Sequence, residues 1–287
     1  MLAEKFQHLA CPLDGLALSN LGSMLKCPHG HSYDIARQSY VNLLPVQQKK
    51  SRDPGDSKDM VAARTRYLNA GFFQAIASQL NELTLAGTDN MEDLSLLDAG
   101  CGDGYYLDYF YKSISSIEDN NQFRMTGLDI SKWAIQAAAK RSKDVTWVVG
   151  NNQKAPVMEH SIDILWSVFG FSHLAGFKKM LKRRGKLIIV EAGSDHLIEL
   201  RKIIYPKIRD SANHEKTNFS KAGFKQIDQK KVRFQTPALS GEQLADLLSM
   251  TPHLYRASHQ GKQALQAVDQ LVLTVDVVYN VYTADAI

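Results

Sequence analysis

The sequence predicts an α/β fold, built on a mostly parallel sheet and preceded by a small cysteine-containing module. The chain has 287 residues, of which 44% are hydrophobic and 22% charged, and this composition is typical of a globular protein with a sizeable core. Between residues 94 and 191, short apolar runs alternate with helical patterns, as in strands joined by right-handed crossovers. Two of the three cysteines, Cys11 and Cys27, lie in an N-terminal stretch that lacks a helical period until its end.

We divide the chain into three sections. Residues 1–47 form a ribbon-like module, whose alternating segment Tyr40–Leu44 predicts a strand. Residues 48–86 begin with a charged segment, QKKSRDPGDSKD, that is either a linker or a substrate-facing loop. A long helix then runs from the capping residue Ser57 to near Leu85, because apolar side chains recur there at spacings of three or four.

Residues 87–287 form the α/β domain. Strands are expected at 94–97, 123–128, 145–149, 162–168 and 186–191, and helices at 105–112, 131–141 and 173–181. Apolar stretches at 231–234 and 271–281, on either side of a helix at 242–249, could close the sheet as an antiparallel pair. We find no internal repeat.

Several classes of protein are excluded by composition. No apolar run approaches the roughly 20 residues of a membrane span, no secretory signal begins the chain, and three cysteines cannot build a disulfide scaffold. We therefore expect a cytoplasmic protein with no membrane partner. The net charge of +4 is small, but cations cluster at Lys49–Arg52, Lys178–Arg184 and Lys225–Arg233. These clusters permit a polyanionic partner without requiring one.

A glycine-rich loop follows the first strand of the α/β domain. Asp98 precedes Gly100, Gly102 and Gly104 in a G-x-G-x-G pattern that opens a helix. Glycines let the backbone approach a ligand, and a helix N-terminus offers unpaired N–H groups. Because a dinucleotide enzyme would show G-x-G-x-x-G, and an acid here repels pyrophosphate, the loop suits a nucleotide-like ligand with a cationic amino-acid end.

An acidic residue, Asp129, ends the next strand in the sequence GLDIS. A carboxylate at this place can accept both hydroxyls of a ribose. Ile130 beside it, and Asn151 after the third strand, are included in the predicted cofactor site. Together these residues resemble the class I S-adenosylmethionine-dependent methyltransferases, in which the residue after the third strand meets the adenine. A plain glycine turn with a helix-capping Asp129 would leave Asp98 unexplained.

The N-terminal module predicts a metal site. Cys11-Pro-Leu-Asp14 and Cys27-Pro-His-Gly-His31 supply four candidate zinc ligands, Cys11, Asp14, Cys27 and His31, in two short-spaced pairs. His29 or His8 could substitute for one of them. The alternative is a module that has lost its metal and buries two cysteines, although so small a module seldom folds without a structural metal or a disulfide.

Nearly the whole chain resembles the bacterial large-subunit ribosomal RNA guanine-N1-methyltransferases. The resemblance rests on SYVNLLPVQ (39–47), SRDPGDS (51–57), Arg64–Gly71, Leu97–Tyr106, GLDISKWAIQAAAKR (127–141), DHLIELR (195–201) and MTPHLYR (250–256). It implies a Rossmann-like class I methyltransferase sheet behind an N-terminal zinc ribbon that helps to recognise a hairpin of 23S ribosomal RNA. A homodimer is plausible from the resemblance alone.

The resemblance also assigns residues. It places the zinc ligands on Cys11, Asp14, Cys27 and His31, and further cofactor contacts on Phe73, Tyr106, Leu107 and His196. The chain departs from the family's pattern at three places: Asp14 replaces a cysteine, Phe73 replaces a tyrosine, and Val168–Phe171 replaces an Ala-Pro-like segment at the methyl-accepting pocket.

The leading hypothesis is a methyltransferase that acts on guanine N1 in 23S ribosomal RNA. The alternatives are a small-molecule methyltransferase on the same fold and an RNA-binding protein that holds the cofactor without catalysis. No catalytic base is assigned, because His196 fits a cofactor contact better. Phe169 and Phe171 could stack a base or pack in the core.

Overall fold

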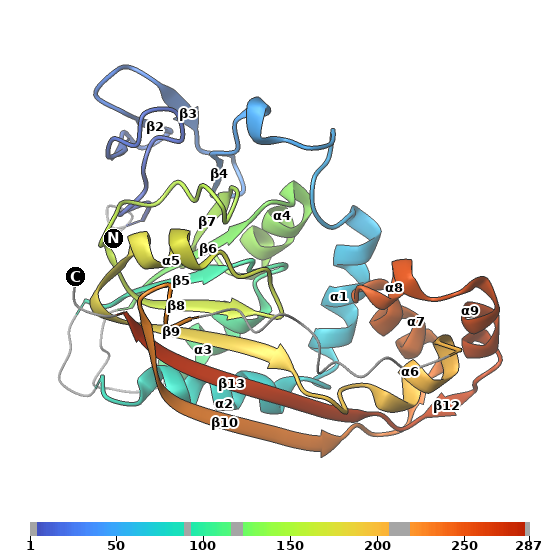
Figure 1. Ribbon diagram of the computed structural model, residues 1–287. Helices are drawn as coiled ribbons and strands as arrows, with labels where there is room; N and C mark the ends of the chain where they lie inside the picture. Colours follow the sequence, from blue (N-terminus) through green and yellow to red (C-terminus); the bar gives the residue numbers. More distant parts are fainter. Residues whose placement is uncertain (1–4, 89–92, 116–122, 207–218, 285–287) are drawn as a thin grey trace.

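A computed structural model describes residues 5–88, 93–115, 123–206 and 219–284. Its centre is an eight-stranded sheet with the order β10-β13-β9-β8-β5-β6-β7-β4 (Figure 1). The strands are β4 (Tyr40–Asn42), β5 (Ser95–Ala99), β6 (Arg124–Asp129), β7 (Thr146–Val149), β8 (Ile162–Val168), β9 (Leu181–Ala192), β10 (Phe224–Gln235) and β13 (Thr274–Ala284). Strands β4 to β9 are parallel, and β13 pairs antiparallel with β9 and β10. The predicted α/β class and its closing antiparallel pair are confirmed.

The helices of the described residues are α1 (Lys58–Asn69), α2 (Gln74–Leu85), α3 (Tyr105–Ile114), α4 (Lys132–Arg141), α5 (Leu174–Met180), α6 (Ile198–Ile204), α7 (Gly241–Ser249), α8 (His253–Arg256) and α9 (His259–Gln266). Five of them, α1, α4, α5, α7 and α9, begin at a residue whose side chain caps the first turn. Ser57 and Ser131 each accept a hydrogen bond from a backbone N–H of the first turn, and Ser240 forms a capping box with Gln243. None of the helices described is long and apolar enough to cross a membrane.

The single long helix predicted from Ser57 to Leu85 is wrong, because the chain breaks between α1 and α2. Gly71 has φ +85°, a left-handed conformation that ends a helix. Its amide donates to the Leu68 carbonyl, and its carbonyl accepts from Gln74. The break places Phe73 at the N-terminus of α2 instead of in mid-helix.

The N-terminal module is a three-stranded antiparallel ribbon of β1 (Ser19–Asn20), β2 (Met24–Lys26) and β3 (Ser32–Asp34). The next strand, β4, leaves the ribbon and pairs in parallel with β7 at the edge of the main sheet. The strand expected at Tyr40–Leu44 thus exists but belongs to the larger sheet. The boundaries at residues 47 and 86 stay predictions.

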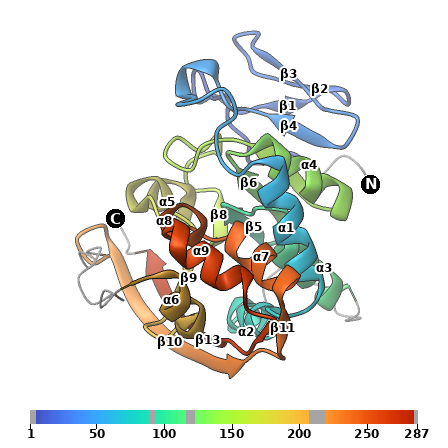
Figure 2. The same ribbon diagram turned by 90° about the vertical axis from the view of Figure 1, so that its right-hand side faces the viewer.

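Two layers of apolar side chains cover the two faces of the sheet. Neighbouring residues of one strand alternate between them, so Leu96 packs with α1 to α4 while Leu97 packs with α5 and the ribbon. Cys11, Leu25 and Cys27 of the ribbon belong to the second layer. The ribbon and the α/β domain therefore share a hydrophobic core, and Figure 2 shows the ribbon beside α4.

The strand order reverses between β5 and β8, which lie side by side in the sheet. This reversal is a topological switch point, and in open α/β sheets ligands bind at the carboxyl ends of the strands at such a point. The glycine loop after β5 and the Val168–Phe171 segment after β8 meet at this edge. A Cβ placed on Gly170 would lie 3.4 Å from the Ala99 carbonyl oxygen.

Gly104→Ala should destabilise the protein strongly. Gly104 has φ +77°, and an added Cβ would lie 2.5 Å from Cη2 of the buried Trp147. Left-handed strain and overpacking together cost about 2–5 kcal/mol. Gly87→Ala is the matched control, because Gly87 has φ +76° with nothing within 4 Å of the added atom. Thermal denaturation should show a clearly larger loss for Gly104→Ala, and equal losses would contradict the packing argument.

Candidate functional site

The glycine loop joins β5 to α3 at the carboxyl edge of the sheet. Gly100, Gly102 and Gly104 have φ values of +98°, +55° and +77°, which explains the three glycines. The amides of Gly100 and Cys101 both donate to the Leu128 carbonyl, so the loop is tied to β6. Asp103, buried in the loop, accepts from Thr65 at 2.9 Å and pairs with Arg141. The loop is therefore held rigidly by α1 and α4.

Asp98 is an ionisable group with no partner in the described structure. Its side chain is fully buried, and neither carboxylate oxygen has a hydrogen-bond partner. Burial, with a smaller effect from the nearby Asp129, raises the pKa of Asp98 to about 8. An unsatisfied buried carboxyl group is costly unless a ligand satisfies it, and a cationic group would do so best.

Asp129 ends β6 and faces the same loop. Its Oδ2 accepts from the Gly102 amide at 3.0 Å, and its Oδ1 accepts from the Ser131 amide at 2.8 Å. A carboxylate has about four lone-pair sites, so each oxygen can accept one more hydrogen bond. Burial raises the pKa of Asp129, and the two amide bonds and Arg64 oppose that rise. The group can thus fix the loop and still accept ligand hydroxyls.

Three rings, those of Phe73, Phe169 and His196, lie together near the end of β8. His196, between β9 and α6, stacks on Phe169 with ring centroids 5.8 Å apart, and Phe73 lies 6.1 Å from His196. The Asp276 amide donates to Nδ1 of His196 at 3.3 Å, and burial lowers the pKa of His196 to about 4. The ring is therefore neutral at pH 7, with its proton on Nε2. Such an imidazole is a poor general base and a good donor to a ligand.

The other predicted cofactor residues, Tyr106, Leu107, Ile130 and Asn151, also follow the carboxyl ends of the parallel strands. Tyr106 and Leu107 are buried in the first turn of α3, and Leu107 is completely enclosed in the core. Ile130 follows Asp129 directly. Asn151 comes two residues after β7, and its side-chain oxygen accepts from the Gln153 amide at 2.9 Å. The structure gathers these residues at one edge, while their cofactor contacts stay predictions.

Sequence reasoning missed the part that the linker plays. A Cβ on Gly55 would lie 2.9 Å from Ile130 Cγ2, and the Ser131 hydroxyl donates to the Asp56 carbonyl at 2.7 Å. The Asp56 carboxylate pairs with Arg64 of α1 at 2.7 Å. SRDPGDS is a distinctive string in the sequence, but its position against the loop after β6 depends on packing that no local pattern reveals.

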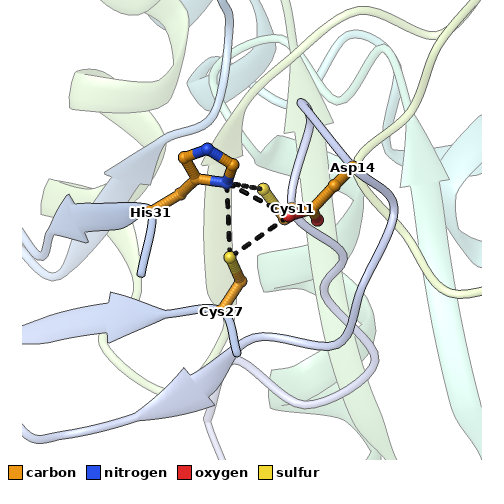
Figure 3. Close-up of side chains that lie close together, drawn as sticks. All are labelled: Cys11, Asp14, Cys27 and His31. Atoms are coloured by element: carbon orange, nitrogen blue, oxygen red, sulfur yellow. Dashed lines mark hydrogen bonds and ion pairs between the residues drawn. The ribbon is translucent and has the colours of Figure 1, made fainter. Parts of the chain in front are cut away.

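The ribbon brings the four predicted metal ligands together (Figure 3). One donor atom from each of Cys11, Asp14, Cys27 and His31 lies within 4.8 Å of all the others. His31 Nδ1 is 3.5 Å from Cys11 Sγ, 3.3 Å from Cys27 Sγ and 3.1 Å from Asp14 Oδ2. Tetrahedral zinc bonds of ordinary length place ligand atoms roughly 3.3–3.8 Å apart, so the cluster fits a zinc ion.

Neighbouring groups form hydrogen bonds that orient two of the candidate zinc ligands, Asp14 and Cys11. The Leu16 amide donates to Asp14 Oδ1 at 3.0 Å, and this bond holds the pKa of Asp14 well below its usual range. Tyr33 lies 3.1 Å from Cys11 Sγ and can donate to it. Nδ1 of His29, an alternative ligand, lies 3.2 Å from Asp14 Oδ2, but the side chain is 67% exposed and is not part of the four-residue cluster. The four residues first predicted are therefore the better donor set.

Comparisons with known proteins agree with both halves of this description. Residues 9–52 match the family described as RlmA, N-terminal, a zinc ribbon, and residues 96–187 match a methyltransferase domain. The chain is 31% identical over 284 residues, 95% of each chain, to a Bacillus subtilis protein provisionally named 23S rRNA (guanine-N1)-methyltransferase YxjB. It is 26% identical to the Streptomyces fradiae 23S rRNA (guanine(748)-N1)-methyltransferase, over 86% of this chain and 85% of that one.

A solved structure shares the fold. It is the complex of the Haloferax volcanii Trm112 methyltransferase activator with its provisionally named methyltransferase, and it matches with a TM-score of 0.50 at 19% identity, over 83% of this chain and 100% of that one. The sheet, the glycine loop and the ribbon thus define a methyltransferase domain behind a zinc ribbon. At 31% identity over nearly its full length, the chain belongs to the family of 23S rRNA (guanine-N1)-methyltransferases.

The methyltransferase domain implies S-adenosylmethionine as cofactor, and the site fits that molecule. Its ammonium group matches the unpartnered Asp98, and its ribose hydroxyls match the open lone pairs of Asp129. The left-handed glycines leave room for close approach of the amino-acid part. When bound, the cofactor supplies an electrophilic methyl group on a sulfonium.

The raised pKa of Asp98 predicts that cofactor binding releases protons. With a pKa of about 8, Asp98 is mostly protonated at pH 7, and a bound ammonium group lowers that pKa. Up to about one proton should leave, and affinity should rise from pH 6 towards pH 8, where the ligand's own amine begins to lose its charge. Titration calorimetry in buffers of different ionisation enthalpy measures this release. Asp98→Asn should bind more weakly and release none, and equal release from both proteins would contradict the assignment.

Proposed function

We propose that this protein transfers a methyl group from S-adenosylmethionine to N1 of a guanine in 23S ribosomal RNA. The observation that carries the proposal is the match over 95% of the chain to a relative named for that reaction, in a structure whose cofactor edge has the matching charges. Methyl transfer from a sulfonium is an in-line displacement, so the protein mainly supplies position and electrostatic complementarity.

The target base has to be unpaired, because N1 lies on the edge that pairs in a duplex. A hairpin of the RNA, which the family resemblance implies as the substrate, offers such a base in its loop. Cations at the junction between ribbon and sheet support an RNA partner. Lys49, Arg52 and Lys132 line one pocket together with Asp53, beside Ile130 and the partly buried Trp133. Such a site can hold the backbone of the RNA. The homodimer and the cytoplasmic location stay predictions.

Phe171 is the residue best placed to contact the target base. Its side chain is 96% exposed, and it lies at the switch-point edge after β8. The neighbouring Phe169 has φ +51°, an uncommon conformation for a residue other than glycine, and its amide donates to the Val190 carbonyl at 2.9 Å. A strained segment with exposed aromatic rings beside a cofactor loop is typical of a substrate contact.

Phe171→Ala should weaken RNA binding without affecting the cofactor. Loss of one base-stacking contact costs about 1–3 kcal/mol, or about 5- to 150-fold in the KM for RNA. Ile227→Ala is the control, because Ile227 is 54% exposed on β10, at the far edge of the sheet. Steady-state assays with 23S RNA should separate the two variants. An unchanged KM for Phe171→Ala would remove this residue from the substrate site.

Reverse transcription gives a direct test of the proposed function. A methyl group on guanine N1 blocks pairing, so 23S RNA from cells with the active gene should stop the transcriptase at one guanine. The stop should vanish in a deletion strain, return with the wild-type gene and not return with a variant that cannot bind the cofactor. Identical patterns in the parent and the deletion strain would overturn the proposal.

A further inference from the structure

Arg64 of α1 lies directly on the glycine loop. A Cβ built on Gly102 would be 2.8 Å from Nη1 of Arg64 and 3.5 Å from its Cδ. Any side chain at Gly102 would displace the guanidinium group, so the glycine is needed for Arg64 as well as for its own backbone. Arg64 is only partly exposed, with 23% of its side chain accessible.

The guanidinium group of Arg64 is anchored through one of its nitrogens, Nη2. Nη2 pairs with the Asp56 carboxylate at 2.7 Å and donates to the Met250 carbonyl at 3.2 Å. Both of these bonds use the same nitrogen, while Nη1 faces the loop. A guanidinium group has five N–H donors in a fixed plane, so an anchored Arg64 can still present a donor pair to an anion.

Asp98 and Arg64 act on the same part of the site with opposite charges. Burial raises the pKa of Tyr106; among the smaller effects, the positive charge of Arg64 opposes that rise and Asp98 adds to it. Burial also raises the pKa of Asp129, and Arg64 opposes that rise too. Tyr106 thus lies within electrostatic reach of both. A site with a buried, unpartnered carboxyl group before the glycine loop and an anchored guanidinium group against that loop is complementary to an α-amino acid, which carries one charge of each sign.

We propose that Arg64 binds the α-carboxylate of the methionine part of S-adenosylmethionine, while Asp98 faces its ammonium group. The inference rests on the cofactor of the proposed function and does not depend on the RNA. It gives the SRDPGDS segment a role, because Asp56 of that segment holds the guanidinium group in place. The linker would then be part of the cofactor site.

Decarboxylated S-adenosylmethionine provides the test, since it keeps the amine and lacks only the carboxylate. Titration calorimetry on the full chain should show that the wild type prefers S-adenosylmethionine by about 10- to 100-fold, the value of one charge-assisted pair. Arg64→Met should bind the two ligands with nearly equal affinity. Arg64→Lys should keep part of the preference, because it keeps the charge without the planar fork.

Arg66→Met is the matched control. Arg66 lies on the same helix and pairs with Asp246 of α7, so the variant also loses an α1–α7 contact but should keep the full preference. If Arg64→Met weakened both ligands equally, Arg64 would be a structural residue and the proposal would be wrong. Failure of RNA methylation with an intact preference would overturn the proposed function and leave this inference standing.

Discussion

Asp129→Ala is expected to weaken S-adenosylmethionine binding by at least about 100-fold, because it removes the carboxylate that we expect to accept two charge-assisted bonds from the ribose. The same carboxylate accepts from the amides of Gly102 and Ser131, so the variant also loosens the glycine loop. Titration calorimetry measures the affinity. Asp129→Asn should be nearly as weak, since an amide nitrogen cannot accept a hydrogen bond.

Asp163→Ala is the control for Asp129→Ala. Asp163 accepts from the Ser95 amide at 2.9 Å and pairs with Lys182. It lies where β5 and β8 begin, at the opposite ends of these strands from the cofactor loop. The variant should lower stability and leave cofactor affinity unchanged. If Asp129→Ala bound the cofactor as well as Asp163→Ala does, the ribose assignment would be wrong.

Cys27→Ser is expected to abolish zinc retention and with it the methylation of RNA. A structural zinc site stabilises its module by about 10–16 kcal/mol, so loss of one of four ligands should unfold the ribbon. Because Cys27 belongs to the core that the ribbon shares with the sheet, the melting temperature of the whole chain should also fall. Zinc content after dialysis against a chelator, measured by atomic spectroscopy, checks the first effect.

Two companion variants separate the ligand from its neighbours. His29→Ala should retain zinc, because the His29 side chain is exposed and lies outside the four-residue cluster. Asp14→Cys should hold zinc more tightly than the wild type, because thiolate is a softer ligand than carboxylate. Zinc retained by Cys27→Ser, or lost from His29→Ala, would show that the donor set differs from the one proposed.

The central fold could be predicted because each of its elements has its own period. The strands and helices from β5 to β9 appear in the predicted order, since an apolar run or a helical stripe marks each one. The break at Gly71 was missed because apolar spacing continues across it. The short helices α6, α8 and α9 were missed too, since few residues of each face the core.

Only some residues of the candidate sites could be predicted from the sequence. The glycine loop and the metal ligands could be predicted because their residues lie close together in the sequence. Arg64 and Asp56 could not, because their position depends on how α1 packs against a loop far along the chain. The pairing of β4 with β7 also joins distant segments, and no local pattern indicates it.

Nucleoside analysis of the methylated RNA measures methyl transfer to guanine N1 directly. The protein is incubated with methyl-labelled S-adenosylmethionine and 23S ribosomal RNA from a strain that lacks the gene, and the RNA is digested for nucleoside mass spectrometry. We expect label in 1-methylguanosine, at a single site, with none when Asp129→Ala replaces the wild type. Absence of label from RNA, despite measurable cofactor binding, would contradict the account and favour a small-molecule substrate or a non-catalytic role.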